Sequence, residues 1–163
     1  MNIERWILIG IIIFCIFALI KIVPNGKARE AWVLFLFLQV ITWPAGLLAV
    51  ELGWIDYPVQ LFPKTNQYNR TSFSFEFFFF PVLAIIFSLY YPSFLKKWSA
   101  LLYYLLFAGF FTIIEVILEK YTDLVEYYEW KWYWTFSTLI LSLYLNHKYY
   151  LWFKKRLVKV GRK

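Results

Sequence analysis

The sequence predicts an all-α, polytopic membrane protein, folded as a bundle of five transmembrane helices. Three observations predict this class: an extreme apolar composition, long apolar runs, and an uneven distribution of lysine and arginine. Of the 163 residues, 62% are apolar and 25% are aromatic, and the mean hydropathy is +0.59. Soluble domains are usually about 45–50% apolar, and a globule of this size has too little interior to bury the excess. The single cysteine, Cys15, excludes a disulfide-stabilised secreted scaffold.

Helices that cross a membrane need roughly 20 mostly apolar residues to span a hydrocarbon core of about 30 Å. Four segments meet this requirement: Trp6–Val23, Ala31–Val50, Phe73–Tyr91 and Trp98–Leu118. A fifth runs from Trp132 to about Leu145 and extends to Phe153 if Lys148 reaches toward the headgroups. We therefore expect residues 1–163 to form one integral-membrane domain, with helices at about 6–23, 31–50, 73–91, 98–118 and 132–153.

The positive charges predict the orientation, because cytoplasmic loops of membrane proteins carry an excess of lysine and arginine. With five spans, the N-terminus shares its side with Arg5, Lys64, Arg70, Lys120 and Lys131. The other twelve of the 17 basic residues fall on the opposite side: Lys21, Lys27, Arg29, Lys96, Lys97, Lys148, Lys154, Lys155, Arg156, Lys159, Arg162 and Lys163. We expect an N-terminus outside, a cytoplasmic C-terminus and a multi-pass location in the plasma membrane.

Two acidic residues lie inside the predicted spans, where charges are costly and usually face the interior of a bundle. Glu76 lies three residues into the third span, and Glu115 lies three residues before the end of the fourth. At 1.5 Å per residue, each is roughly 4–5 Å below the outer boundary. The short turn Pro92–Lys97 predicts that these helices are antiparallel neighbours. The two carboxyl groups are thus candidates for one shared site.

Thr112, Glu115 and Glu119 share one helix face with Ala108, at spacings of four, three and four residues. A bound cation, Lys120 or a shared proton would relieve the repulsion between the carboxylates of Glu115 and Glu119. These residues are candidates for a cation, proton or ligand site. The alternative is that water solvates Glu119 while Glu115 bonds to a neighbouring helix.

Internal prolines interrupt two of the predicted spans. Pro44 cannot bond to the carbonyl of Val40, nor Pro81 to that of Phe77. Gln39 lies near the first interruption, so it completes the set of candidate polar residues at membrane depth. Interrupted helices beside polar side chains form ion sites in many carriers. The alternative is that both prolines only kink their helices.

Catalytic motifs are missing from the sequence. There is no phosphate-binding glycine loop, no G-x-S-x-G and no H-E-x-x-H. His147 is the single histidine, so no histidine-based metal site is expected, and whether another metal binds stays open. We expect no cofactor and no nucleic-acid partner, because the basic tail beside a span suits anionic lipid. Membrane lipids, other membrane proteins or a second copy of the chain are the expected partners.

Several stretches, spread over most of the chain, carry a resemblance to a known family. They are MNIERWILIG, REAWVLFLFLQVITW, GWIDYPVQLFPK, TSFSFEFFFFP and EVILEKYTDLVEYYEWKWYWTF. They resemble uncharacterised small multi-pass membrane proteins of spore-forming Gram-positive bacteria, which implies five helices and no known activity. Separately, FEFFFFP is similar to the acid-containing motif of bacterial carotenoid lycopene cyclases, which typically has paired acids where this chain has Glu76 alone.

Two classes of function follow. The first, which we prefer, is a membrane assembly subunit or a binding and transport component with an outward-facing region rich in acidic and aromatic residues. The second is an intramembrane enzyme acting on a lipid or an isoprenoid, with Glu76 and Glu115 as general acid and base. Carboxyl groups that converge on an enclosed cavity with a lipid-side opening favour the enzyme, and carboxyl groups that face different ways favour assembly.

Overall fold

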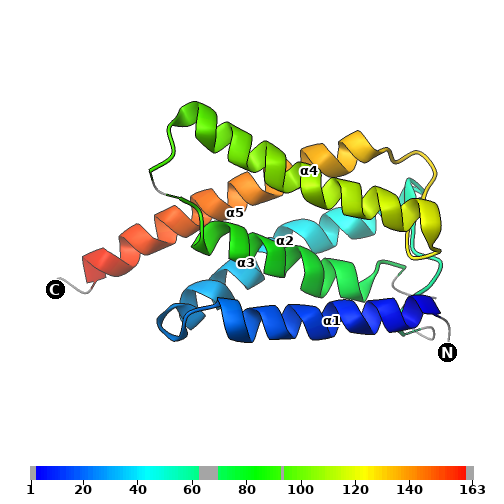
Figure 1. The fold of residues 1–163 in the computed structure, drawn as a ribbon, viewed down its shortest axis with the longest axis horizontal. Helices are drawn as coiled ribbons and strands as arrows, with labels where there is room; N and C mark the ends of the chain where they lie inside the picture. Colours follow the sequence, from blue (N-terminus) through cyan, green and yellow to red (C-terminus); the bar gives the residue numbers. More distant parts are fainter. Residues whose placement is uncertain (1–2, 63–69, 93, 161–163) are drawn as a thin grey trace.

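The computed structural model describes residues 3–62, 70–92 and 94–160 of the chain. Five long helical segments run roughly along the long axis of the molecule (Figure 1). They are α1 (Ile3–Ile22), α2 (Ala28–Glu51), the π-helix η2 (Ser74–Phe79) that continues into α3 (Phe80–Leu89), α4 (Lys97–Tyr121) and α5 (Trp132–Val160). A short 3-10 helix, η1 (Asn25–Lys27), joins α1 to α2. The predicted all-α class is therefore confirmed.

Within the described residues, three helices are long and apolar enough to cross a membrane: α1, the continuous segment Asn25–Glu51 and α4. Their most apolar windows have mean hydropathies of 2.5, 2.1 and 2.2, yet no more than 28% of any window is buried. Large apolar side chains such as Phe14, Val40 and Phe110 are more than half exposed. Apolar surface this extensive suits a lipid solvent and is rare on monomeric soluble proteins.

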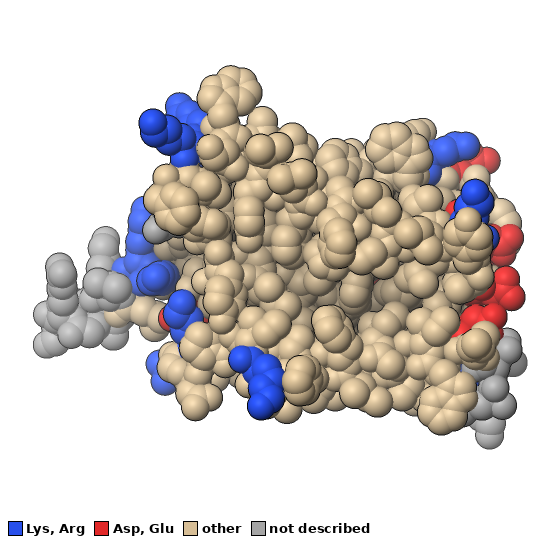
Figure 2. All heavy atoms as spheres, viewed as in Figure 1, with Lys and Arg blue, Asp and Glu red and all other residues tan. Residues whose placement is uncertain are grey.

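Charged side chains lie mainly at the two ends of the molecule (Figure 2). Lysine and arginine gather at the end where the C-terminus lies, and aspartate and glutamate gather at the opposite end with a few basic side chains. Lys64, Arg162 and Lys163, which the charge count includes, lie outside the described residues. The belt between the two ends is almost free of charge on the face shown, as a lipid environment requires.

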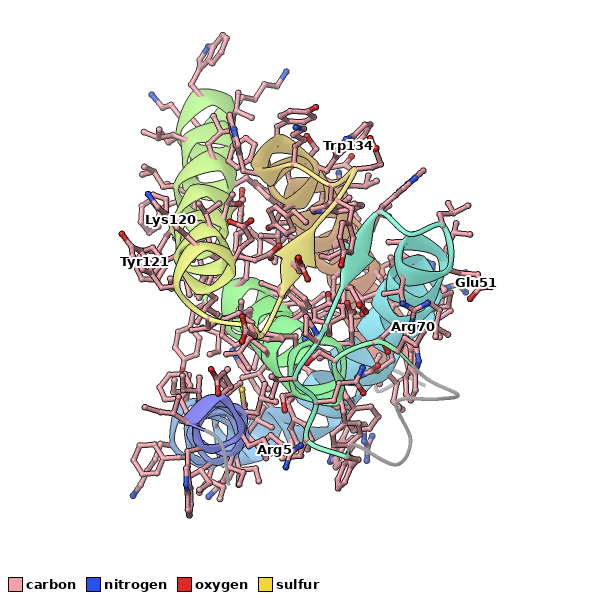
Figure 3. The ribbon with its side chains drawn as sticks, turned by 90° about the vertical axis from the view of Figure 1, so that its right-hand side faces the viewer. Arg5, Glu51, Arg70, Lys120, Tyr121 and Trp134 are labelled. Carbon is pink, nitrogen blue, oxygen red and sulfur yellow. The ribbon has the colours of Figure 1, made fainter. Side chains whose placement is uncertain are left out.

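A cap closes the acidic end of the bundle. The strands β1 (Ile55–Asp56) and β2 (Glu126–Tyr127) pair antiparallel, with Ile55 opposite Tyr127 and Asp56 opposite Glu126. The pair lies across the helix ends (Figure 3), and we call residues 54–59 and 123–130 the cap. The Trp54 carbonyl accepts the backbone N–H groups of Tyr128 and Trp130 at 3.1 and 2.9 Å. These bonds tie the α2–η2 connection to the α4–α5 connection, which are far apart in the sequence.

The short helix α3 occupies the centre of the bundle. Residues 81–85 are buried, and the Phe87 side chain has no exposed surface. Pro81 lies in the first turn of α3, where a helix tolerates its missing N–H. The segment η2–α3 and the helix α4, predicted to be neighbours, meet through aromatic rings. The ring centroids of Phe87 and Phe107 lie 5.1 Å apart, and those of Phe79, in η2, and Phe111 lie 5.8 Å apart. The bundle therefore surrounds η2 and α3, the segment that carries Glu76.

Candidate functional site

A cavity of about 120 Å³ lies between α2, α3, α4 and α5, directly beneath the cap. Near the cap, the polar side chains that line the cavity belong to the cap itself and to the neighbouring helix ends: Tyr57, Glu76, Glu115, Trp130 and Thr135. The lining farther from the cap is mostly apolar and includes Leu38, Ala84, Phe107, Phe111 and Leu143. The cavity is therefore amphipathic, with a polar end beneath the cap and an apolar floor near the middle of the bundle.

Glu76 reaches the cavity from the π-helix η2. π-Helical turns are rare and often occur at functional sites, and this one ends just before Pro81. The Glu76 side chain is 7% exposed, and its carboxyl group accepts a hydrogen bond from the Tyr57 hydroxyl. Gly46 of α2 makes room for it: a Cβ atom at Gly46 would lie 2.7 Å from Glu76 Oε1. Glycine at this point of α2 therefore leaves the Glu76 carboxyl group room that any larger residue would take.

Glu115 is the centre of a hydrogen-bond network between α4, α5 and the cap. Its Oε1 atom accepts the Thr135 hydroxyl at 2.7 Å and also the Tyr127 hydroxyl. The Trp130 indole N–H donates to Thr135 Oγ1 at 2.8 Å, and Tyr127 and Thr135 oxygens lie 3.2 Å apart. Two hydroxyl groups therefore hold the Glu115 carboxyl group in the wall of the cavity, and the Trp130 indole holds one of these hydroxyl groups in place.

The two cap tyrosines are hydrogen-bond donors at neutral pH. Burial, followed by the charge of the Glu76 carboxyl, raises the pKa of the Tyr57 hydroxyl well above its ordinary value of 10.0. Burial, followed by the Glu115 carboxyl, raises the pKa of the Tyr127 hydroxyl in the same way. Each tyrosine hydroxyl therefore stays protonated and donates a hydrogen bond to one carboxyl group, so hydrogen bonds connect the cap to both carboxyl groups.

No basic side chain faces the two carboxyl groups among the described residues that line the cavity. The ammonium group of Lys120 lies 5.7 Å from the centre of the Tyr121 ring, and both residues lie at the rim of the bundle (Figure 3). Each carboxylate would feel the charge of the other. Two like charges in one cavity need a proton, a cation or a positively charged ligand to offset their repulsion.

The cavity opens sideways between α2 and α5. These helices meet near the C-terminal end, where the rings of Phe37 and Tyr149 stack with 4.0 Å between centroids. They diverge toward the capped end (Figures 1 and 3). Ala45 of α2 and Thr138 of α5 both line the cavity, and both are exposed. The cavity is therefore accessible from the side of the bundle between these two helices.

The structure brings Glu76 and Glu115 together and places the other three candidates elsewhere. Gln39 lies outside the cavity lining, and its Nε2 atom donates at 2.9 Å to the Phe77 carbonyl, which Pro81 cannot bond. Thr112 donates to the Ala108 carbonyl within α4 at 2.9 Å. Glu119 is half-buried one turn beyond Glu115 and does not line the cavity. Gln39 therefore stabilises an interrupted helix, and Thr112 bonds to the backbone of its own helix.

Four side chains of this site were not among the site candidates predicted from the sequence: Tyr57, Tyr127, Trp130 and Thr135. Pairing of the two cap strands is a long-range contact that no local pattern indicates, so the tyrosines had no signal. Thr135 did have one. Thr135, Thr138, Ser142 and Asn146 recur at spacings of three, four and four residues, which puts four polar side chains on one face of α5.

Metal binding by the protein alone finds no support in the described part of the chain. No three histidine, cysteine, aspartate or glutamate side chains converge there in a way that would hold a metal ion. Comparison with protein-family models, with curated proteins and with solved structures gives no match to this chain.

Proposed function

We propose that the protein is a five-span, multi-pass protein of the plasma membrane, with its N-terminus and cap outside and its C-terminus in the cytoplasm. The gathering of basic side chains at the C-terminal end supports this orientation, because such residues are retained on the cytoplasmic side. In this orientation the cavity lies in the outer half of the bilayer. We propose further that it binds a small organic cation that enters from the lipid between α2 and α5.

The observation that carries this proposal is the pair of carboxyl groups, Glu76 and Glu115, in one cavity whose described lining contains no basic residue. A cationic group would offset the repulsion between them, and its contact with the carboxylates would be strong because little water screens it. The aromatic walls add favourable contacts, since cations bind the faces of aromatic rings. Cavities of this order hold a group about the size of one aromatic ring.

Calorimetric titration of the purified protein in detergent tests the proposal, with benzylammonium as the cation and benzyl alcohol as its neutral analogue. We expect benzylammonium to bind at least about tenfold more tightly, a difference of about 1.4 kcal/mol. Glu76→Gln and Glu115→Gln should each remove this preference. Glu51→Gln is the matched control, because this exposed carboxylate lies at the same end of the bundle and points away from the cavity (Figure 3).

Equal affinities for the cation and the neutral analogue would overturn the proposal. So would a cation preference that survives in both cavity variants. Loss of the preference in the Glu51→Gln control would show that general surface charge attracts the cation, and would also contradict a specific site.

A second candidate function is an intramembrane enzyme acting on a lipid or an isoprenoid. Two observations favour it: Glu76 and Glu115 line one cavity, and the lining of that cavity includes the exposed residues Ala45 of α2 and Thr138 of α5. One carboxyl group would donate a proton and the other would accept one. Mass spectrometry of lipid extracts tests it: cells that express the wild-type chain should contain a species that is missing with Glu115→Gln. Identical extracts would exclude this function.

The remaining proposal, a membrane assembly subunit, would use the lipid-facing helix surfaces rather than the cavity. It predicts that a partner or a second copy is cross-linked in native membranes through exposed positions such as Phe14 or Phe110. Only monomers after cross-linking at both positions would exclude it.

A further inference from the structure

An apolar layer closes the cavity toward the middle of the bundle. Leu38 of α2, Ala84 of α3 and Leu143 of α5 pack into one cluster with Phe87, and none of their side chains is more than 3% exposed. We call Leu38, Ala84 and Leu143 the plug. Because all three also line the cavity, the plug separates the cavity from the part of the bundle interior that lies nearer the C-terminal end.

One helical turn beyond the plug, the interior becomes polar again. Ser88 follows Ala84 by four residues on α3, and Asn146 follows Ser142 by four on α5. Their exposures are 2% and 0%. The Asn146 amide nitrogen lies 3.5 Å from the Leu34 carbonyl oxygen, a long contact on α2. Asn146 Oδ1 and Ser88 Oγ have no hydrogen-bond partner among the described residues.

His147 extends this buried polar layer. Its side chain is 6% exposed, its ring lies 4.2 Å from that of Tyr91, and its Nδ1 atom is also without a partner in the described part of the chain. Unpartnered polar atoms are rare in buried positions and call for an explanation. Three of them in one layer, from α3 and α5, indicate a site that polar species occupy at some stage.

The polar groups continue to the basic end of the molecule. The Tyr150 hydroxyl, one turn beyond Asn146, donates a hydrogen bond to the Glu30 carboxylate at the start of α2. The polar face of α5 then consists of Thr135, Thr138, Ser142, Asn146 and Tyr150, spaced by three or four residues. These 15 intervals correspond to about 22 Å along the helix, and each step of roughly 4.5–6 Å is a distance that one bridging water can span.

We propose that this face of α5 is a proton path from the cavity carboxyl groups to Glu30, interrupted by the plug as a gate. It rests on the proposed function, because it starts at the same carboxyl pair. A proton enters at Glu76 or Glu115, passes along bridging waters that the α5 hydroxyl and amide groups hold by hydrogen bonds when the plug opens, and leaves at Glu30. Nothing is oxidised or reduced, and each group returns to its original state after passing one proton.

Other titratable groups also face this path. Tyr57 and Tyr127 bond to the carboxyl pair at its start. Beyond the plug, Tyr91 faces His147. At the basic end, the Lys154 ammonium lies 6.0 Å from the centre of the Tyr150 ring.

Proteoliposomes test the path. The full-length protein is reconstituted with the pH dye pyranine inside, and a potassium gradient with valinomycin drives proton uptake. We expect wild-type vesicles to take up protons at least about tenfold faster than protein-free vesicles. Asn146→Leu should abolish this excess, and the smaller change Ser88→Ala should reduce it. The matched control is Ser137→Ala, on the exposed side of α5, which should keep the wild-type rate.

Wild-type vesicles no faster than protein-free vesicles would overturn the path. So would Asn146→Leu and Ser88→Ala vesicles that both keep the wild-type rate. The cation titration distinguishes the two proposals, because Asn146 lies beyond the plug and its variants should still bind benzylammonium. Proton uptake without cation binding would contradict the ligand proposal alone, and cation binding without uptake would contradict the path alone.

Discussion

Gly46→Ala is the sharpest test of the cavity geometry, because it adds one methyl group beside Glu76. The new Cβ atom would lie 2.7 Å from Oε1 and 2.9 Å from Cδ of Glu76, whereas ordinary contacts begin at 3.4 Å. The carboxyl group therefore has to retreat by about 0.7 Å, the difference between 3.4 and 2.7 Å. Overpacking of this kind costs about 1–3 kcal/mol, and displacing the carboxyl group also weakens its bond with Tyr57.

The control for this prediction is Gly10→Ala in α1, where an added Cβ would have nothing within 4 Å. Both substitutions replace glycine by alanine inside a helix, which by itself stabilises a helix by up to about 1 kcal/mol. The difference between them therefore isolates the clash. We expect Gly46→Ala to unfold at lower temperature than Gly10→Ala in detergent, by an equivalent of about 1–3 kcal/mol.

A double variant strengthens the test. In a Glu76→Ala background the obstructing carboxyl group is gone, so Gly46→Ala should lose its penalty, and the coupling between the two sites should be measurable. If Gly46→Ala proves as stable as Gly10→Ala and binds benzylammonium as tightly as the wild type, Glu76 does not lie against α2 and the cavity as described is wrong.

Three further predictions follow from the same structure. Glu115→Leu should destabilise the protein by about 1–3 kcal/mol for each hydroxyl it leaves unpaired on Tyr127 and Thr135, whereas Glu115→Gln keeps an acceptor and should cost less. Thermal unfolding of both variants compares their stabilities, and equal losses of stability would contradict the hydrogen-bond network around Glu115. Reporter fusions at Lys163 and in the connection 52–72 should give cytoplasmic and outside signals respectively, and a cytoplasmic signal from the connection would reverse the proposed orientation. Truncation of residues 154–163 should leave the bundle folded by circular dichroism, because residues 154–157 are exposed at the end of α5; loss of stable protein would show that the tail packs on the bundle.

The convergence of Glu76 and Glu115 changes the balance between the two expected classes of function. The sequence alone favours the class without catalysis, with the enzyme as the alternative. Convergence on a cavity with a lateral opening is the arrangement that the enzyme needs, and it also suits a ligand site. Cation titration and lipid extracts separate these two uses of one cavity, so neither depends on fold-level analogy.

Local signals in the sequence determined the helical class and the approximate limits of the helices. Runs of about 20 apolar residues leave few alternatives to a helix that bonds its own backbone, so the segments near 6–23, 31–50 and 98–118 match α1, α2 and α4. The same reasoning singled out Glu76 and Glu115, because the cost of an acid among apolar residues is visible without any tertiary contact.

Tertiary structure alone decided how these residues are used. The helical signal for 73–91 did not reveal that this stretch begins as the π-helix η2 and lies in the centre of the bundle. Nor did it reveal that Ile55 pairs with Tyr127, more than 70 residues away in the chain. Hydropathy records how apolar a segment is, whereas strand pairing, the clearance at Gly46 and the meeting of two carboxyl groups depend on how separate segments pack. Those contacts are non-local, and no stretch of sequence carries them by itself.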